Sequence, residues 1–513
     1  MKQIILIAFR NLARHKVKTA ITVIAVTVSV ALYIFMDGWL VGMNLESQRN
    51  IVNYETGAAK LQGRLYFEKK DELPMYESFA EWQSYAAALD KAGYDSAPRF
   101  VFTGTLYGKT GSAPMEFIAC DPAAESKLLR YSPYMESGRY IQPGAFELVL
   151  GTMAAEKLKT GIPQRPTSGE LEELLAELGD AIDNADREFI TGLYEPVQPK
   201  KPGLYETKDE LAEGETRLVL KNSIPAADID RYWNILADAG RMHVRISTVI
   251  DIKENGTNGN EVIRHVNQLI DAVVVGVVNS PDPRTNTNVA YLPLDVLQDE
   301  AGLMLDGHVT ELLIREKNPR DAALPGKHES VNSITAAVSG ITTLPPDLTV
   351  YSWIDYAGDY FAVSNADNVS SRIIILLLFI LSFLGIANTM LMAILERTKE
   401  IGMMRAMGMT DAQLTGTYMI EAGLVGALGS LFGIIAGCLI NIPMVEYGVD
   451  FSALAQSVGG DIGYRVASNF RSAWNPPVII GAGIAATLLA SLMAFLPCRR
   501  ALKMPVTESL RFE

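Results

Sequence analysis

The sequence predicts an α-helical membrane protein with four transmembrane helices and a large α+β extracytoplasmic domain inserted between spans one and two. A helix needs about 20 apolar residues to cross the hydrocarbon core of a bilayer. Four segments meet that requirement, at 19–42, 372–395, 415–445 and 476–496. The polar block 43–371 contains no such run, so we expect the whole block on one side of the membrane.

The composition agrees with a chain that is partly membrane and partly polar. A chain of 513 residues is too long for one domain. Its hydrophobic content of 49% is too high for an average soluble protein. The net charge of −14 argues against nucleic-acid binding. Cys120, Cys438 and Cys498 fall in the polar block, an apolar run and the basic C-terminal segment, so no intrachain disulfide is expected.

The first 18 residues are basic and precede the first apolar run. Because cytoplasmic segments carry an excess of Lys and Arg, we expect 1–18 as a cytoplasmic, interfacial helix. A cleaved signal peptide is the alternative. The long basic leader, an apolar core longer than the usual ~7–15 residues and the lack of a small-x-small cleavage site favour an uncleaved anchor.

The polar block mixes strand and helix patterns, which is typical of an α+β domain. The predicted strands are Arg99–Leu106, Glu116–Ala119, Glu147–Leu150, Ala272–Val278 and Leu312–Arg315. The predicted helices are Ser78–Ala92 and Thr152–Lys159. Leu45–Leu61 is expected to extend span one as a stalk helix.

Residues 161–240 differ in composition from the rest of the block. They are acidic at first and then rich in Pro and Lys, and we interpret them as an inserted subdomain with a helix at Ser168–Leu178. Such an insert either carries partner specificity or is a solvated surface decoration. The sequence leaves both interpretations open.

No motif in the chain indicates catalysis. GTLYGKT, Gly104–Thr110, has three residues between its glycines where a phosphate loop has four. Asp251–Glu261 partly matches a calcium loop, but Lys253 and Val262 stand at ligand positions, so an Asn-Gly hairpin turn is preferred. The five histidines show no metal-site or nucleophile spacing. We therefore expect no enzyme activity, metal or cofactor in this chain.

The C-terminal third alternates apolar spans with short connections. In order, we expect span two at 372–395, a basic cytoplasmic loop at 396–414, span three at 415–445, an extracytoplasmic loop at 446–475, span four at 476–496 and a basic cytoplasmic tail at 497–513. Both termini are then cytoplasmic and the large domain is extracytoplasmic.

Span three contains a stripe of glycines and one acidic residue. Small residues let membrane helices approach closely. The glycines are Gly423, Gly426, Gly429, Gly433 and Gly437. Their spacing fits packing within one subunit and a seam between two copies equally well. Because an acid inside an apolar span is costly, Glu421 is expected to be functional and hydrogen-bonded to a neighbouring helix.

The loop between spans two and three reads ERTKEIGMMRAMGM, from Glu396 to Met409. As a helix, it places Ile401, Met404 and Met407/Gly408 on one apolar stripe. Such a helix is either an amphipathic connector lying on lipid headgroups or a knob for a cytosolic partner, whose groove adaptable Met side chains would fill.

This wording closely resembles the coupling loop of the FtsX-like permeases, the MacB-type family of ABC transporters, in which R-x-x-E-I-G-x-x-R-A-x-G contacts the ATPase. The matching residues are Arg397, Glu400, Ile401, Gly402, Arg405, Ala406 and Gly408. Weaker resemblances occur at AFRNLARHKVKT near the N-terminus, at Gly138–Leu158, around Glu421 and in the C-terminal LPCRRALKMPVTESLRFE. The insert 161–240 does not align with the family.

The resemblance implies a permease subunit of an ATP-driven ABC transporter that works by mechanotransmission in the inner (plasma) membrane. ATP and Mg would be bound by a cytosolic ABC ATPase dimer, and a second permease copy or a paralogue would complete the complex. The layout is closest to the lipoprotein-releasing Lol permeases. It implies lipoprotein release or export of an envelope substrate, with membrane lipid and an extracytoplasmic acceptor protein as further partners. The alternative is a membrane-anchored receptor or an activator of an envelope enzyme, without transport.

Overall fold

The computed structural model describes residues 16–503 except 110, 130–131, 198–214, 222, 256–260, 281–282, 300–306, 318–323, 326–328, 341–343, 359–368, 378, 382, 384–387, 389–390, 393–395, 397 and 451–468. The chain divides into two compact units. The helical unit consists of Met1–Ser47, Asp359–Asp450 and Asn469–Glu513. The α+β unit consists of Gln48–Gly358 together with Phe451–Ser468.

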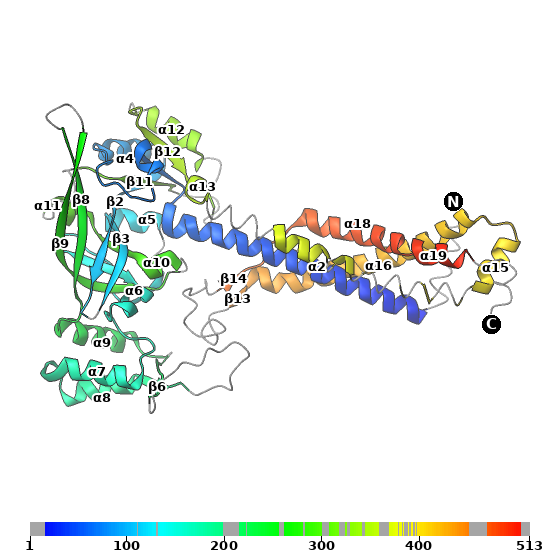
Figure 1. The fold of residues 1–513 in the computed structure, drawn as a ribbon, viewed down its shortest axis with the longest axis horizontal. Coiled ribbons are helices and arrows are strands. Elements are labelled where there is room, and N and C mark those ends of the chain that lie inside the picture. Colours follow the sequence, from blue (N-terminus) through cyan, green and yellow to red (C-terminus); the bar gives the residue numbers. More distant parts are fainter. Residues whose placement is uncertain are drawn as a thin grey trace. The chain divides into compact units, whose positions relative to one another are not determined.

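Three described helices are long and apolar enough to cross a membrane, at Thr19–Thr56, Asp411–Glu446 and Pro476–Arg500. They contain α2 (Lys16–Ile51) with the π-helix η1 (Val52–Thr56), then α16 (Asp411–Glu446), and α18 (Pro476–Met493) with most of α19 (Phe495–Ala501). The predicted spans at 19–42, 415–445 and 476–496 lie within them. In Figure 1, α2, α16 and α18 run side by side.

The span predicted at 372–395 falls only partly on described residues. A shorter apolar helix, Val369–Leu381, is present there. Two side chains of this segment, Phe379 and Phe383, are buried in one apolar cluster with Val30 of α2 and Ala486 of α18. The segment is therefore packed into the bundle, and a fourth complete span remains a prediction.

Local sequence explains where the two C-terminal helices begin. Thr410 precedes α16 and its hydroxyl accepts a hydrogen bond from the Gln413 N–H (3.3 Å), while the Gln413 side chain accepts one from the Thr410 N–H (3.0 Å). This reciprocal capping box satisfies donors that the first helical turn leaves unpaired. Helix α18 starts with proline, which has no N–H to satisfy at that position.

The glycine stripe of α16 is covered by helices of the same chain. A Cβ atom added to Gly429 would lie 2.6 Å from Val26 Cβ, and one added to Gly433 would lie 2.7 Å from Val30 Cβ. Farther along, Gly437 faces Ala31, also on α2. The structure thus places these glycines in packing within one subunit, the first of the two arrangements that the spacing allowed.

Two other glycines of the stripe face α18. An added Cβ would lie 2.6 Å from Ala490 Cβ at Gly426 and 3.6 Å from Ser491 at Gly423, which is ordinary contact. The Thr27 hydroxyl of α2 donates to the Gly429 carbonyl (3.1 Å), and the Ser491 hydroxyl donates to the Met419 carbonyl (2.8 Å). Such short side chains tie helix backbones together where they approach closely.

The α+β unit is built on a 10-stranded sheet in the order β12-β1-β11-β2-β3-β10-β5-β9-β4, with β8 pairing with both β2 and β9. The strands are β1 (Ala59–Gly63), β2 (Tyr94–Tyr107), β3 (Ser112–Cys120), β4 (Met135–Gly138), β5 (Glu147–Gly151), β8 (His243–Asn255), β9 (Glu261–Val278), β10 (Val289–Pro293), β11 (Glu311–Glu316) and β12 (Leu348–Ser352). All five predicted strands lie within this set. Two small strand pairs lie elsewhere, β6 (Tyr194–Pro196) with β7 (Leu218–Leu220), and β13 (Val449–Asp450) with β14 (Asn469–Phe470) of the helical unit.

Helices cover both faces of the sheet. They are α3 (Arg64–Glu68), α4 (Trp82–Lys91), α5 (Pro122–Leu128), α6 (Thr152–Lys157), α10 (Pro283–Asn288), α11 (Leu294–Asp299), α12 (Val331–Ser339) and α13 (Trp353–Tyr356). The larger apolar core includes Leu89 of α4 and Ile334 of α12. The smaller core, on the other face, includes Leu128 of α5 and Tyr54 of η1. The predicted helices at Ser78–Ala92 and Thr152–Lys159 correspond to α4 and α6.

The described residues of the insert 161–240 include the helices α7 (Ser168–Leu178), α8 (Asn184–Gly192) and α9 (Ala226–Asp238), which lie together in Figure 1. The bounds of α7 match the predicted helix, and Thr167 with Glu170 caps its start. Leu171, Ile190 and Leu236 are buried in the larger core of the unit. The described part of the insert is therefore packed against the core of the domain, and its role stays a prediction.

Both false site motifs begin within strands, GTLYGKT in β2 and the Asp251 segment in β8. Gly104 is inside β2, where an added Cβ would meet the Ser247 carbonyl oxygen of β8 at 2.7 Å, so the glycine permits close strand pairing. Strands β8 and β9 pair up to Asn255 and Glu261. This pairing makes the segment a β-hairpin, as the Asn-Gly turn predicted, although 256–260 lie outside the described residues.

The glycine contacts give a direct stability test. We expect Gly433→Leu to destabilise the helical unit by about 1–3 kcal/mol, because the larger side chain must push Val30 and the Thr27 carbonyl of α2 away. The measurement is thermal unfolding of the purified full chain in detergent. Gly481→Leu on α18 is the control, since no atom lies within 4 Å of its added Cβ. Equal melting temperatures for the two variants would show that α2 and α16 do not pack through this glycine.

Candidate functional site

The segment between the second apolar helix and α16 forms a short helix, α15 (Thr398–Ala406). Its end has the geometry of a Schellman motif: the Gly408 N–H donates to the Arg405 carbonyl (3.0 Å) and the Met409 N–H to the Met404 carbonyl (3.1 Å). Gly408 has φ of +96°, a conformation that glycine adopts without the strain of a Cβ. The presence of glycine at position 408 therefore has a structural explanation, because this residue ends α15 and turns the chain toward α16.

The predicted apolar stripe is divided by the structure into an inner part and an outer part. Ile401 is only 2% exposed and packs in a cluster with Leu414 and Tyr418 of α16 and Cys498 of α19. Met404 and Met409 are partly buried against the same cluster. These residues hold α15 onto its own chain and are not available as a whole to a partner. Gly402, next to Ile401, is buried as well.

The outer apolar surface of α15 is formed by methionines. Met403 is 49% exposed and Met407 is 77% exposed. Ala406 and Gly408 lie on the exposed surface with them. Sequence reasoning included Met407, Ala406 and Gly408 but missed Met403, because that residue falls off the stripe defined by Ile401 and Met404. The exposed surface is therefore narrower than predicted and centred on Met403 and Met407.

Charged residues fix the turn between the two helices. Arg405 Nε lies 3.1 Å from Asp411 Oδ1, in the first turn of α16, where an acidic residue also favours the helix dipole. Glu400 is half-buried in the first turn of α15. Arg397, the first residue of the predicted motif, lies outside the described residues. Arg405 thus serves the internal geometry of the loop.

Glu421 lies ten residues into α16 and is buried at 9% exposure. It follows Tyr418, which belongs to the cluster under α15, by one helical turn. Glu421 therefore lies one helical turn from the residues of α16 that pack against α15. The glycines from Gly426 onward continue the same helix toward its other end.

A polar cluster at the far end of the same helices was not predicted. The side chain of Asn475, just before α18, donates to Asp37 of α2 (2.8 Å), and the Ser472 hydroxyl donates to Asn441 of α16 (2.6 Å). The Ala473 N–H donates to the Gly38 carbonyl of α2 (2.9 Å). Because polar groups inside apolar helices are rarely tolerated unpaired, these bonds fix the entry to α18 against α2 and α16.

Comparison with known proteins points to one family for the C-terminal part of the chain. The model of the FtsX-like permease C-terminal family matches residues 372–506. The ABC transporter permease YtrF of Bacillus subtilis is 34% identical over 141 residues, covering 26% of this chain and 30% of YtrF. The macrolide export ATP-binding/permease protein MacB of Psychrobacter arcticus is 30% identical over 167 residues, covering 30% of this chain and 22% of that protein.

A longer match reaches into the rest of the chain. MacB of Chromobacterium violaceum is 24% identical over 249 residues, which is 48% of this chain and 34% of that protein. The chain thus spans at most about a third of these relatives' length. Among solved structures, the periplasmic region of MacB from Actinobacillus actinomycetemcomitans covers 61% of this chain and 95% of its own, with 9% identity and a TM-score of 0.29.

The matched residues hold the elements described above. The family region begins in the second apolar helix and includes α15, α16, α18 and α19. The exposed methionines, the Schellman turn at Gly408 and the buried Glu421 all lie inside it. Residues 372–506 are therefore similar to the FtsX-like permease C-terminal family.

Proposed function

We propose that this chain is the permease subunit of an ATP-driven ABC transporter complex that works by mechanotransmission. The observation that carries the proposal is α15, a short helix that is held by its inner face and exposes Met403 and Met407 on its outer face. Flexible, polarizable methionines suit an irregular groove on a partner. The proposed partner is a cytosolic ABC ATPase dimer, which would bind ATP and Mg.

The packing of α15 supports force transmission and not simple anchoring. Ile401 and Met404 pack against α16 and α19, and Arg405 pairs with Asp411. A displacement of α15 by the ATPase therefore moves α16 with it. Helix α16 in turn packs on α2 through Gly429 and Gly433, so the motion reaches the first span.

The first span continues beyond the membrane as a stalk. Helix α2 with η1 runs without a break from Lys16 to Thr56, about 60 Å at 1.5 Å per residue, against a hydrocarbon core of about 30 Å. The stalk leads directly into β1 of the α+β unit. The close contact of α2 with α16 leaves little room for a substrate between them. The proposed mechanism does not require a substrate to pass between these helices.

For the substrate we propose lipoprotein release or export of an envelope compound, handled by the α+β unit on the extracytoplasmic side of the inner (plasma) membrane. The MacB relatives are named for macrolide export, which supports outward handling. A second permease copy or paralogue, membrane lipid and an extracytoplasmic acceptor protein complete the proposed assembly. A receptor or an envelope-enzyme activator would not require an ATPase. Association with an ATPase therefore distinguishes a permease from these two alternatives.

The proposed topology can be tested with exposed cysteines. Cys120 and Cys498 are buried, so the exposed Lys91 of α4 and Lys503 after α19 are better positions. We expect Lys91→Cys to react with an impermeant thiol reagent in intact cells with a permeable outer envelope, and Lys503→Cys to react only after lysis. Reaction of Lys503→Cys before lysis would contradict the topology.

The proposed ATPase contact predicts a specific loss of binding. Met407→Glu places an unpaired charge in the partner's groove, which costs about 2–5 kcal/mol of association, so the ATPase should no longer co-purify. Met404 is less suitable, because it packs internally. Arg405→Ala should give a milder loss, since it loosens the turn at Asp411 without placing a charge in the groove.

The matched control for Met407→Glu is Leu65→Glu, which puts the same charge at an exposed apolar residue of the α+β unit. It should leave ATPase co-purification unchanged. The readout is the ratio of ATPase to permease in affinity-purified complexes of equally expressed variants. An unchanged ratio in Met407→Glu would mean that α15 is not the ATPase contact.

A further inference from the structure

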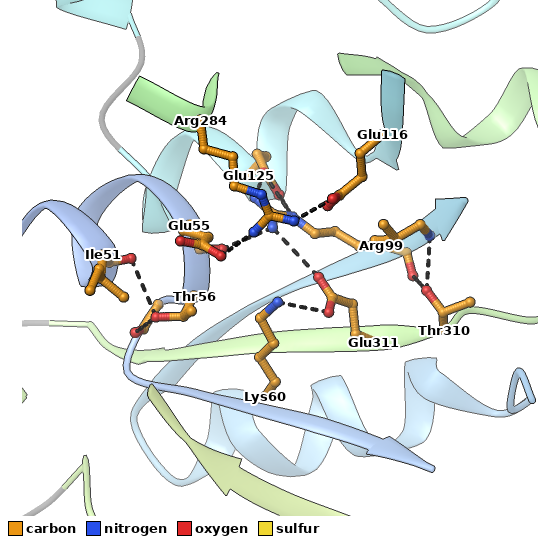
Figure 2. Close-up of polar contacts among 12 residues, drawn as sticks. Ile51, Glu55, Thr56, Lys60, Arg99, Glu116, Glu125, Arg284, Thr310 and Glu311 are labelled. Carbon is orange, nitrogen blue, oxygen red and sulfur yellow. Dashed lines mark hydrogen bonds and ion pairs between the residues drawn. The ribbon is translucent and has the colours of Figure 1, made fainter. Parts of the chain in front are cut away.

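The stalk enters the α+β unit through an unusual turn. At its end, α2 changes into the π-helix η1 (Val52–Thr56), and Gly57, with φ of +64°, leads into β1. Short π-helical turns are rare and occur frequently at functional sites. The Thr56 hydroxyl donates to the Ile51 carbonyl (3.3 Å) and closes the turn, as Figure 2 shows.

A buried arginine from the middle of the sheet binds the end of this turn. Arg99 of β2 is 1% exposed, and its Nη1 donates to the backbone carbonyl of Glu55 (3.0 Å). Its Nε donates to both carboxylate oxygens of Glu125 on α5 (3.0 and 3.2 Å), and Nη1 lies 3.5 Å from Glu311 of β11. A guanidinium at the carbonyl end of a helix also complements the helix dipole. One side chain thus joins the stalk, two strands and a helix.

The neighbouring cations keep Glu311 ionised. Burial raises the pKa of Glu311, but Lys60 and Arg99 outweigh it and hold the pKa below its usual value. Lys60 Nζ of β1 lies 2.8 Å from Glu311 Oε2. Register pairs Glu311 directly with Arg99 across β11 and β2, so the carboxylate is fixed between cations from both adjoining strands.

Two further cations hold the same turn. Arg284 of α10 pairs with the Glu55 carboxylate and with Glu116 of β3, as Figure 2 shows. Arg315 of β11 donates to the Asn53 side chain (2.8 Å). Cations from β2, β11 and α10 therefore bind positions 53 and 55 of the turn. Between them, the Tyr54 hydroxyl donates to the Tyr134 hydroxyl (2.9 Å). The turn cannot shift without displacing the sheet or separating buried charge pairs.

We infer that this cluster, Glu55, Arg99, Glu116, Glu125, Arg284 and Glu311, is the joint through which displacement of the first span reaches the sheet of the α+β unit. The inference rests on the proposed function and deepens it, because it assigns Arg284 and Arg99 as positioning residues of force transmission. A sheet tied to the stalk at β2, β3 and β11 moves as one body with the stalk end. The tie at Arg284 is the one that can be cut without opening the core.

The test uses variants at the accessible tie. Arg284 is 41% exposed, so Arg284→Gln and Glu55→Gln remove its ion pairs without leaving a cavity. Arg284→Lys keeps the positive charge but loses the planar guanidinium that pairs with both Glu55 and Glu116. The matched control is Arg139→Gln, since Arg139 is 46% exposed and forms a comparable pair with Glu147 without contacting the turn.

Hydrogen-deuterium exchange of the full chain with its co-purified ATPase, with and without Mg and the ATP analogue AMP-PNP, gives the readout. In the wild type we expect the nucleotide to change exchange both in α15 and in β2, β3 and β11. In Arg284→Gln and Glu55→Gln the change in α15 should remain, while the change in the strands should fall at least about two-fold. Arg284→Lys should be intermediate, and Arg139→Gln should match the wild type.

The outcomes separate the two claims. An unaltered strand response in Arg284→Gln and Glu55→Gln, with the α15 response intact, overturns the joint and leaves the proposed function standing. An equal loss in Arg139→Gln also overturns it, because the effect would then be a general weakening of the domain. Absence of any nucleotide response in α15 of the wild type contradicts the proposed function and the joint together.

Discussion

The close contact between α2 and α16 is the constraint on which the rest of the structure depends. Gly429 and Gly433 bring the α16 backbone against Val26 and Val30, so the two helices interlock and cannot slide independently. At one end of α16, the apolar cluster around Ile401 packs α15 against it. At the other end, Asn441 accepts a hydrogen bond from Ser472, just before α18. Helix α2 is therefore linked to α15 through contacts with α16, although α2 and α15 are far apart in the sequence.

Under the proposed function, this linkage gives these residues a mechanical role that does not require a transport channel. Gly408 ends α15, Arg405 and Asp411 set its angle to α16, and Met403 and Met407 remain exposed. In the α+β unit, Arg99 performs the corresponding task at the stalk end, where it binds the Glu55 carbonyl. In each unit, specific side chains thus fix a helix end to the neighbouring element.

Much of the fold could be predicted from sequence because the signals are local. The spans follow from apolar length, α7 from Thr167 and Glu170 with a periodic apolar face, and the strands from alternation. The partners could not be predicted, because contacts such as Arg99 with Glu125 and Glu311, or Asp37 with Asn475, join residues distant in the chain. The apolar stripe of α15 was predicted as one exposed surface for the same reason: nothing in the segment reveals that Ile401 is covered by α16 and α19.

The central claim is that this chain works as a permease joined to an ATPase, and the composition of the native complex tests it most directly. Native mass spectrometry should be applied to the complex purified in mild detergent through a tag on this chain. The account predicts two permease chains, identical or paralogous, with two ABC ATPase subunits. Recovery of this chain alone, or with partners that include no ATPase, in conditions that preserve other ABC complexes, would contradict it.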